Sequence, residues 1–269
     1  MVAVYSIDGK IKEEIKLPNI FSTGYRPDLI QRAVVAFQSK KRQKYATSEE
    51  AGMRTSAAYF GRRRKVYRTT INRGISRLPR EKTGGGGLGK VRRVPQSVKG
   101  RKAHPPKVEK IYEKKINKKE YTLALKSAIA ALANKELAEK RGHKISKLKD
   151  LPIVVEDSFE KIAKTKDFLK FLNSINLGEE LLRAEKRKVR SGKGKMRGRR
   201  YKRKKSLLLV VSSDSNVLKS SKNIPGIDAI KVDDLNIELL APGTHAGRLS
   251  LWTKSAIERV EDLFKKEEK

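Results

Sequence analysis

The sequence predicts an α/β protein, with a three-layer α/β/α globular domain, a mostly parallel sheet and a long internal extended loop. Short runs rich in Val, Ile and Leu alternate with helical segments in residues 1–40 and 107–269, a rhythm typical of parallel sheets covered on both faces. Residues 41–106 show no sustained period and hold nine of the 19 glycines. We therefore predict one globular domain that is interrupted by an extended basic loop.

The first expected elements are a β-hairpin and a helix. The alternating runs VAVYSI and IKEEIKL flank Asp8 and Gly9, a dipeptide typical of tight hairpin turns. Pro27 then begins a helix, because Pro is favoured in the first turn and because apolar residues recur at helical spacing until Ser39.

After the loop, a long helix is expected to begin behind Asn117 and to end at Gly142. Asn117 and Glu120 have the spacing of a capping box, and Gly is the usual residue just after a helix. The expected elements that follow are a strand in PIVVED, a helix over KTKDFLKFLNSI, a strand in SLLLVV, a strand in DAIKV and a helix from about Thr253 to the end.

The positive charge is concentrated in two internal segments. The net charge of the chain is +35. Residues 39–110 hold 22 Lys and Arg against 4 Asp and Glu, and residues 183–205 hold 14 against 1. These segments supply 31 of the 35 net charges. A field so dense and of one sign repels itself unless a polyanion neutralises it, and nucleic acid does so with closely spaced phosphates.

The loop at 41–106 is predicted to penetrate RNA. Both of its ends return to one folded body, and its glycines allow the backbone to approach a phosphate surface closely. Tyr45, Tyr59, Phe60 and Tyr67 could stack on bases. The alternative is an unstructured solvated loop, because charge runs are usually solvated. The candidate RNA-binding residues are Arg62, Arg63, Arg64, Arg68, Arg73, Arg77, Arg80, Lys90, Arg92, Arg93, Lys99, Arg101 and Lys102.

The segment at 183–205 is expected to be a basic surface loop of the globular domain. It combines glycines with cations, which suits contact with a nucleic-acid backbone, while its tyrosine could stack or pack against the domain. The alternative is an exposed basic hairpin without a specific role. Its candidate RNA-binding residues are Lys193, Lys195, Arg197, Arg199, Arg200 and Tyr201.

No cofactor, metal or catalytic site is expected. Gly84–Lys90 has the spacing of a phosphate-binding loop, but Val91 replaces the required Ser or Thr and no strand-to-helix junction surrounds it. The chain has no Cys and three scattered His, which excludes a thiolate zinc site. The acids Glu156, Asp157 and Asp214 follow strands, yet Asp157 and Glu160 have capping-box spacing, which favours a structural role.

Membrane insertion and secretion are also not expected. The longest apolar run, Leu207–Val211, is far too short to span a bilayer. The N-terminal residues lack the charged-then-apolar order of a signal peptide. An intracellular, cytoplasmic protein is the expectation.

Three separated motifs, in this order, resemble archaeal members of the L-four family of large-subunit ribosomal proteins. They are RRVPQSVKGRKAHPP at 92–106, SGKGKMRGRRYKRKKSLLLV at 191–210 and LLAPGTHAGRLSLWTKSAIERVE at 239–261. The resemblance implies a noncatalytic protein that binds large-subunit rRNA early in assembly and whose loop forms part of the polypeptide exit tunnel. It also implies two further kinds of partner, neighbouring ribosomal proteins and the nascent peptide.

From the residues alone, two other functions stay open. A DNA-binding chromatin protein would use similar charge, and an α/β enzyme could act on nucleic acid. Neither explains a long basic segment inside a folded domain as well as rRNA binding does.

Overall fold

The computed structural model describes residues 1–60 and 69–267, with side chains described as far as Phe264. The chain divides into two compact units. Unit 1 comprises Met1–Lys41 and Glu113–Lys269, and unit 2 comprises Arg42–Tyr112.

Unit 1 is built on a six-stranded sheet in which only the edge strand β2 is antiparallel to its neighbour. The antiparallel pair is the predicted N-terminal hairpin, with Gly9 in the left-handed conformation at its turn (φ 81°). In spatial order the strands are β2 (Ile11–Ile15), β1 (Val2–Tyr5), β5 (Ile153–Val155), β10 (Ser250–Thr253), β8 (Leu208–Val211) and β9 (Asp228–Lys231).

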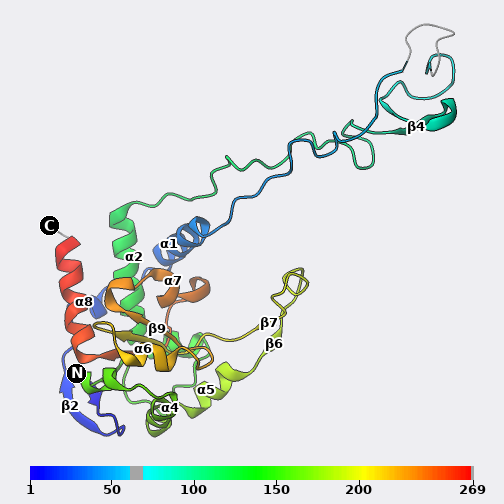
Figure 1. Ribbon diagram of the computed structural model, residues 1–269. Coiled ribbons are helices and arrows are strands. Elements are labelled where there is room, and N and C mark those ends of the chain that lie inside the picture. Colours follow the sequence, from blue (N-terminus) through cyan, green and yellow to red (C-terminus); the bar gives the residue numbers. More distant parts are fainter. Residues whose placement is uncertain (61–68, 268–269) are drawn as a thin grey trace. The chain divides into compact units, whose positions relative to one another are not determined.

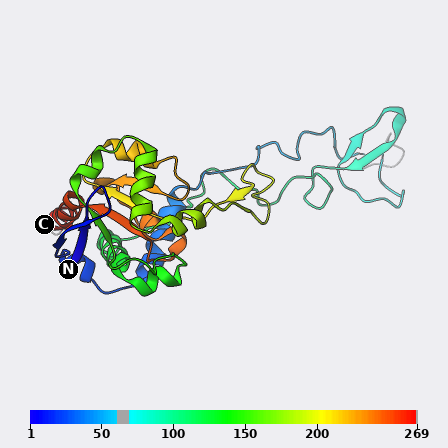
Figure 2. The ribbon, with the colours of Figure 1, turned by 90° about the horizontal axis from the view of Figure 1, so that it is seen from below.

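Helices cover both faces of this sheet (Figures 1 and 2). In the central strand Trp252 belongs to one apolar core and Leu251 to the other, because successive side chains of a strand point to opposite faces. The predicted α/β/α fold is confirmed. The first core includes α1 (Pro27–Lys40), α2 (Lys118–Ala130), α7 (Ile237–Leu240) and α8 (Lys254–Glu267). The second includes η4 (Asp157–Lys161), α4 (Thr165–Ser174) and α6 (Asn216–Ser221).

The remaining helices of unit 1 are short. They are η1 (Asn19–Ser22), η3 (Ala131–Ala133), α3 (Lys135–Lys140), α5 (Gly178–Glu185), η5 (Val232–Asp234) and η6 (Pro242–Thr244). Within residues 1–60 and 69–267, every helix is too short or too polar to cross a bilayer.

The prediction of a single long helix from Asn117 to Gly142 is wrong. The capping box at Asn117 is present, but α2 ends at Ala130. Asn134 adopts an extended conformation, and its side chain accepts a hydrogen bond from the backbone N–H of Leu137 at 3.3 Å. Asn is a strong N-cap, so this residue ends one helical segment and starts α3.

Strand β10 was not expected, although it lies at the centre of the sheet. Its sequence, SLWT, is only four residues long and begins and ends with polar residues that are fully buried.

Asp157 and Glu160, which lie near β10, have structural roles, but they do not form the predicted capping box. Asp157 accepts hydrogen bonds from the backbone N–H and hydroxyl of Ser255 at 3.0 and 2.7 Å, at the start of α8. Glu160 accepts from Ser212 and Thr253 at the ends of β8 and β10.

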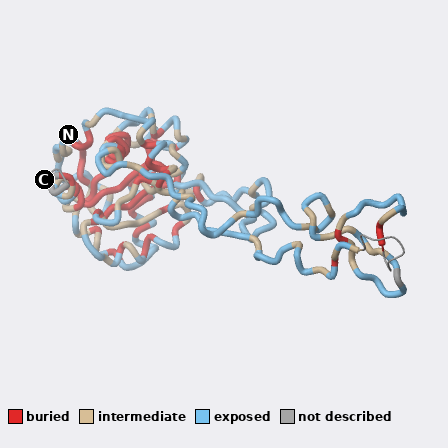
Figure 3. Tube along the Cα trace, turned by 90° about the horizontal axis from the view of Figure 1, so that it is seen from above, coloured by how far each residue is buried: buried red, intermediate tan, exposed pale blue. Residues whose placement is uncertain are grey.

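Unit 2 has little regular structure among its described residues. A short hairpin pairs β3 (Arg80–Lys82) with β4 (Leu88–Val91), and the 3-10 turn η2 (Gly84–Gly86) joins them. The phosphate-loop-like glycines therefore form a strand-to-strand turn. Few of the described residues of unit 2 are buried (Figure 3). None of those that are buried is a large aliphatic or aromatic residue. Such a segment lacks the apolar burial that normally offsets the entropy of ordering.

Candidate nucleic-acid interface

The basic segment of unit 1 folds as a β-hairpin. Strands β6 (Lys188–Val189) and β7 (Tyr201–Lys202) are antiparallel, and the backbone N–H of Arg190 donates to the carbonyl of Arg200 at 2.7 Å. Gly192 and Gly198 have φ values of 76° and 80°, a left-handed conformation that Gly adopts without a steric penalty. The structure thus brings together the predicted side chains Lys193, Lys195, Arg197, Arg199 and Arg200, all of them exposed.

Tyr201 lies close to two arginines at the base of this hairpin. The Cζ atoms of Arg187 and Arg200 lie 5.4 and 5.7 Å from its ring centroid, and the residue is 49% exposed. Cations this close to an aromatic ring are attracted to its face. An exposed ring flanked by cations can stack on an unpaired base while the arginines contact phosphates.

A buried carboxylate ties both ends of the hairpin to unit 1. Glu180 is 1% exposed. Its Oε1 accepts a hydrogen bond from the hydroxyl of Ser206 at 2.8 Å, and its Oε2 accepts one from Nε of Arg183 at 2.7 Å. Nη2 of Arg183 also donates to the carbonyl of Lys205 at 3.0 Å. Residues on both sides of the hairpin are therefore held by one acid on α5.

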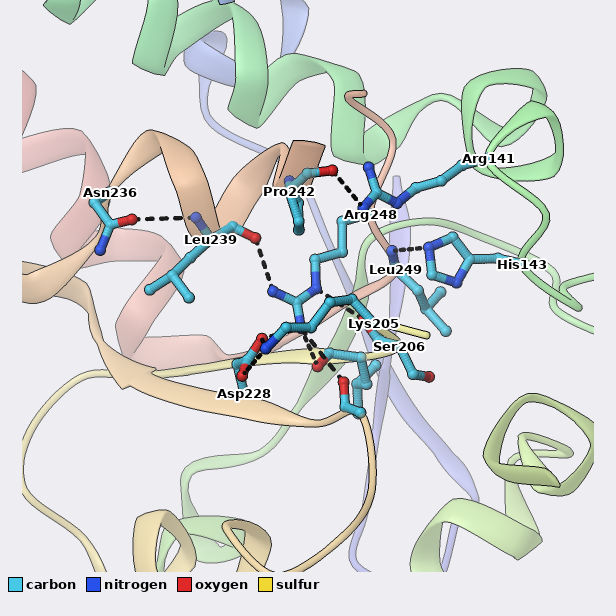
Figure 4. A network of polar contacts seen from close by, with 12 residues as sticks. Arg141, His143, Lys205, Ser206, Asp228, Asn236, Leu239, Pro242, Arg248 and Leu249 are labelled. Atoms are coloured by element: carbon cyan, nitrogen blue, oxygen red, sulfur yellow. Dashed lines mark hydrogen bonds and ion pairs between the residues drawn. The ribbon is translucent and has the colours of Figure 1, made fainter. Parts of the chain in front are cut away.

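His143 completes this site as a neutral ring. Its Nε2 accepts a hydrogen bond from the backbone N–H of Leu249 at 3.4 Å (Figure 4), so its Nδ1 carries the proton and donates to Glu180 at 2.7 Å. Burial lowers the pKa of His143, and the hydrogen bond to Glu180 offsets this only in part. Burial alone would raise the pKa of Glu180, but hydrogen bonds from Arg183 and His143 outweigh it and lower the pKa to about 2.

The lowered pKa values of Glu180 and His143 predict that unit 1 loses stability in acid. Both pKa values lie below their unfolded values of 4.5 for Glu and 6.5 for His, so the unfolded chain binds more protons. The free energy of unfolding should therefore fall as pH drops below about 6.5, and further from about 4.5 towards 2. Urea unfolding from about pH 7.5 to about pH 2.5 measures this.

The control for the acid prediction compares two histidine substitutions. His143→Gln should flatten the profile between about pH 6.5 and 5, whereas His104→Gln, at an exposed site, should leave it unchanged. A wild-type profile that is already flat over this range would show that His143 titrates normally.

Arg248 is a second buried anchor beside the hairpin (Figure 4). It is 0% exposed. Its Nη2 lies 2.6 Å from the carboxylate of Asp228, and it also donates to the carbonyls of Ser206, Leu207 and Leu239. Lys205 binds the same carboxylate at 2.8 Å. Arg248 thus fixes the point where the hairpin enters β8.

Sequence reasoning missed Glu180, His143 and Arg248. Arg248 carried the clearer signal, since it is a charged residue next to the apolar Leu249 and two positions before β10. For Glu180 and His143 there was none, because they are 37 residues apart and only the fold brings them together.

The candidate residues of unit 2 fall into three groups. Arg80 and Arg92 are half-buried and bonded within the unit: Arg80 donates to the hydroxyl of Ser76 at 2.8 Å, and Nε of Arg92 donates to Glu81 at 3.1 Å. Arg62, Arg63, Arg64 and Arg68 lie outside the described residues. The exposed members are Arg73, Arg77, Lys90, Arg93, Lys99, Arg101 and Lys102.

A loop over residues 93–101 holds three of these cations, Arg93, Lys99 and Arg101. The backbone N–H of Arg101 donates to the carbonyl of Arg93 at 3.4 Å. Arg93 and Lys99 both have left-handed backbones, with φ values of 76° and 58°, a conformation that costs energy for residues with side chains. A Cβ on Gly52 would meet the backbone of Gly100 at 2.5 Å, so Gly is required where the two segments of unit 2 cross.

Two tyrosines of unit 2 stack on each other. The rings of Tyr45 and Tyr112 are 6.0 Å apart with an interplanar angle of 16°, and Cζ of Arg42 lies 4.3 Å from the Tyr112 centroid. Burial and the neighbouring Tyr45 raise the pKa of Tyr112. Tyr45, which is predicted to stack on bases, stacks here on Tyr112, the last residue of unit 2, and is 53% exposed.

The acids at the carboxyl ends of β5 and β8 were the other candidates for a chemical site. No group of three or more His, Cys, Asp or Glu that could hold a metal is found within residues 1–60 and 69–267. A pocket of about 580 Å³ at the carboxyl ends of β5 and β8 is lined by Asp157, Glu160 and Asp214 together with three lysines. Asp157 caps the start of α8, and Glu160 joins the ends of β8 and β10.

Comparison with known proteins identifies the family. The model described as "Ribosomal protein L4/L1 family" matches residues 15–263. The chain is similar to "Large ribosomal subunit protein uL4" of Methanosphaera stadtmanae (48% identical, 98% of each chain) and of Methanoculleus marisnigri (48% identical, covering 97% of this chain and 98% of the relative). It is 47% identical to the protein of the same name from Archaeoglobus fulgidus, over 95% of this chain and 96% of the relative. With a match over nearly its full length and two exposed basic segments, the chain belongs to the ribosomal protein L4/L1 family.

Proposed function

We propose that this protein is a noncatalytic constituent of the large ribosomal subunit, in the cytoplasm, and that it binds rRNA through unit 2 and the 183–205 hairpin. The observation that carries the proposal is the placement of charge: 29 of the net +35 lie in these two segments, and most of their candidate cations are exposed. Release of counterions from the RNA would drive binding, while RNA shape and stacking on Tyr201 would add specificity.

Unit 2 is the part that we propose to enter the RNA and to line part of the polypeptide exit tunnel, where it would meet the nascent peptide. Family resemblance supports this role. So does its composition, because a segment without a large buried apolar side chain among its described residues gains order most readily from a partner that surrounds it. Contacts with several rRNA elements would also make the protein an early binder in subunit assembly.

A competition experiment distinguishes rRNA binding from DNA binding. The full chain is bound to a labelled large-subunit rRNA fragment at about 150 mM salt and competed with the same unlabelled RNA or with duplex DNA of equal length. We expect RNA to compete at concentrations at least about tenfold lower, because A-form shape and unpaired bases contribute beyond phosphate charge. Equal competition by DNA would support the alternative of a basic chromatin protein.

Arg93 and Arg92 should contribute differently to binding. Arg93→Ala should make the salt dependence of rRNA affinity shallower by about one unit, as expected for one lost phosphate contact. Arg92→Ala should change the slope less, because its guanidinium already bonds to Glu81 and to the carbonyl of Val98. Filter binding from about 50 to 300 mM salt gives both slopes, and an unchanged slope for Arg93→Ala would remove Arg93 from the phosphate contacts.

A further inference from the structure

An apolar groove lies along helices α1 and α2 in unit 1. It has a volume of about 990 Å³, and its apolar lining residues are Ala33, Ala36 and Phe37 from α1 together with Ile116 and Leu123 at α2. Leu123 is 51% exposed, although these helices bury their other apolar faces in the first core. Exposed apolar patches of this kind mark interaction surfaces.

The charged residues that line the groove are all lysines. Lys40, Lys118, Lys119 and Lys126 line it, and neither Asp nor Glu is among its lining residues. A strip of one charge around an apolar floor is complementary to a segment that is apolar on one face and acidic at its edges.

We propose that this groove binds an amphipathic helix with acidic flanks from a partner protein. Helix-in-groove recognition places apolar residues at i, i+3, i+4 and i+7 on the floor, and acidic residues beside them would face the lysines. A partner protein fits this groove better than RNA does. The lining has no Arg and no Gly, whereas both RNA-binding segments are rich in them, and the α1 and α2 amides in the helix interiors are used within the helices.

Photo-crosslinking of assembled large subunits tests the proposal. Cells whose only copy of this protein carries p-benzoylphenylalanine at position 123 supply the subunits, and the crosslinked partner is identified by mass spectrometry. We expect a crosslink to a peptide of another protein with apolar residues at helical spacing and Asp or Glu beside them. Lys118→Glu combined with Lys119→Glu should lower the yield at least fivefold, through like-charge repulsion. The matched control position is Leu182, a 61% exposed leucine on α5, which should not yield the same peptide.

Several outcomes would overturn the inference. They are a crosslink to RNA, to residues 265–269 of the same chain or to a peptide without acidic residues, a yield unaffected by the charge reversal, and no crosslink at all. The test relies on the proposed function only because large subunits are the source of the crosslinked material. Failure of the proposed function and failure of the groove proposal give different results. Absence of the chain from large subunits contradicts the proposed function, whereas its presence there without the expected crosslink contradicts the groove.

Discussion

Replacing Arg248 by Ala is expected to lower the free energy of unfolding of the protein by about 3–5 kcal/mol. The substitution leaves the half-buried carboxylate of Asp228 without its closest cation and removes donors from the buried carbonyls of Ser206 and Leu207. Breaking one side of a buried ion pair costs more than the pair itself contributes. Since domains are typically stable by about 5–15 kcal/mol, this loss is a large share of the total.

Urea unfolding followed by circular dichroism measures the effect, with Arg259→Ala as the matched control. Arg259 pairs with Asp233 at 2.6 Å, but both side chains are 44% exposed, so its loss should cost at most about 1 kcal/mol. Arg248→Lys should lie between the two, because a lysine keeps the charge but not the planar arrangement of five donors. Equal losses for Arg248→Ala and Arg259→Ala would show that burial of Arg248 has no energetic role.

Neutralising the tip of the 183–205 hairpin is expected to have the largest effect on rRNA binding. If each of five cations contacts one phosphate, the salt dependence should become shallower by about four units, and affinity at about 100 mM salt should fall ~10³-fold. Stability should hardly change, because these side chains are exposed. The variant replaces Lys193, Lys195, Arg197, Arg199 and Arg200 by Ala.

The control for this variant removes the same number of charges elsewhere in unit 1. It replaces the exposed residues Lys10, Lys166, Lys170, Lys219 and Lys222 by Ala. If the hairpin acts through phosphate contacts, the control should reduce affinity far less, since long-range attraction between exposed charges is screened beyond about 8–10 Å. Equal losses in the two variants would mean that only net charge matters, and the hairpin would then have no particular role.

Much of the fold could be predicted because local signals agreed with the tertiary structure. The Asp8–Gly9 turn, the helix from Pro27 and the Val- and Leu-rich strand at 208–211 all appear where their sequences indicate. The break at Asn134 was missed because helix propensity on both sides outweighed one capping residue. Strand β10 was missed because its burial, rather than its composition, makes it a strand.

The sequence could predict which two segments make up the candidate interface, but not how their side chains are arranged. Charge density located the two basic regions, and composition supplied the residue types. The Glu180–His143 pair joins residues that are 37 positions apart in sequence. The internal bonds of Arg80 and Arg92 and the pairing of the hairpin at 188–202 depend on the exact path of the local backbone. Periodicity and spacing contain no record of such contacts.

Determining the structure of a large ribosomal subunit that contains this chain tests the central claim most directly. We predict continuous density for Arg42–Tyr112 within rRNA, with phosphates at hydrogen-bonding distance from Arg93, Lys99 and Arg101 and from cations of the 183–205 hairpin. Density that places these two segments on the solvent side, with no RNA beside them, would contradict it.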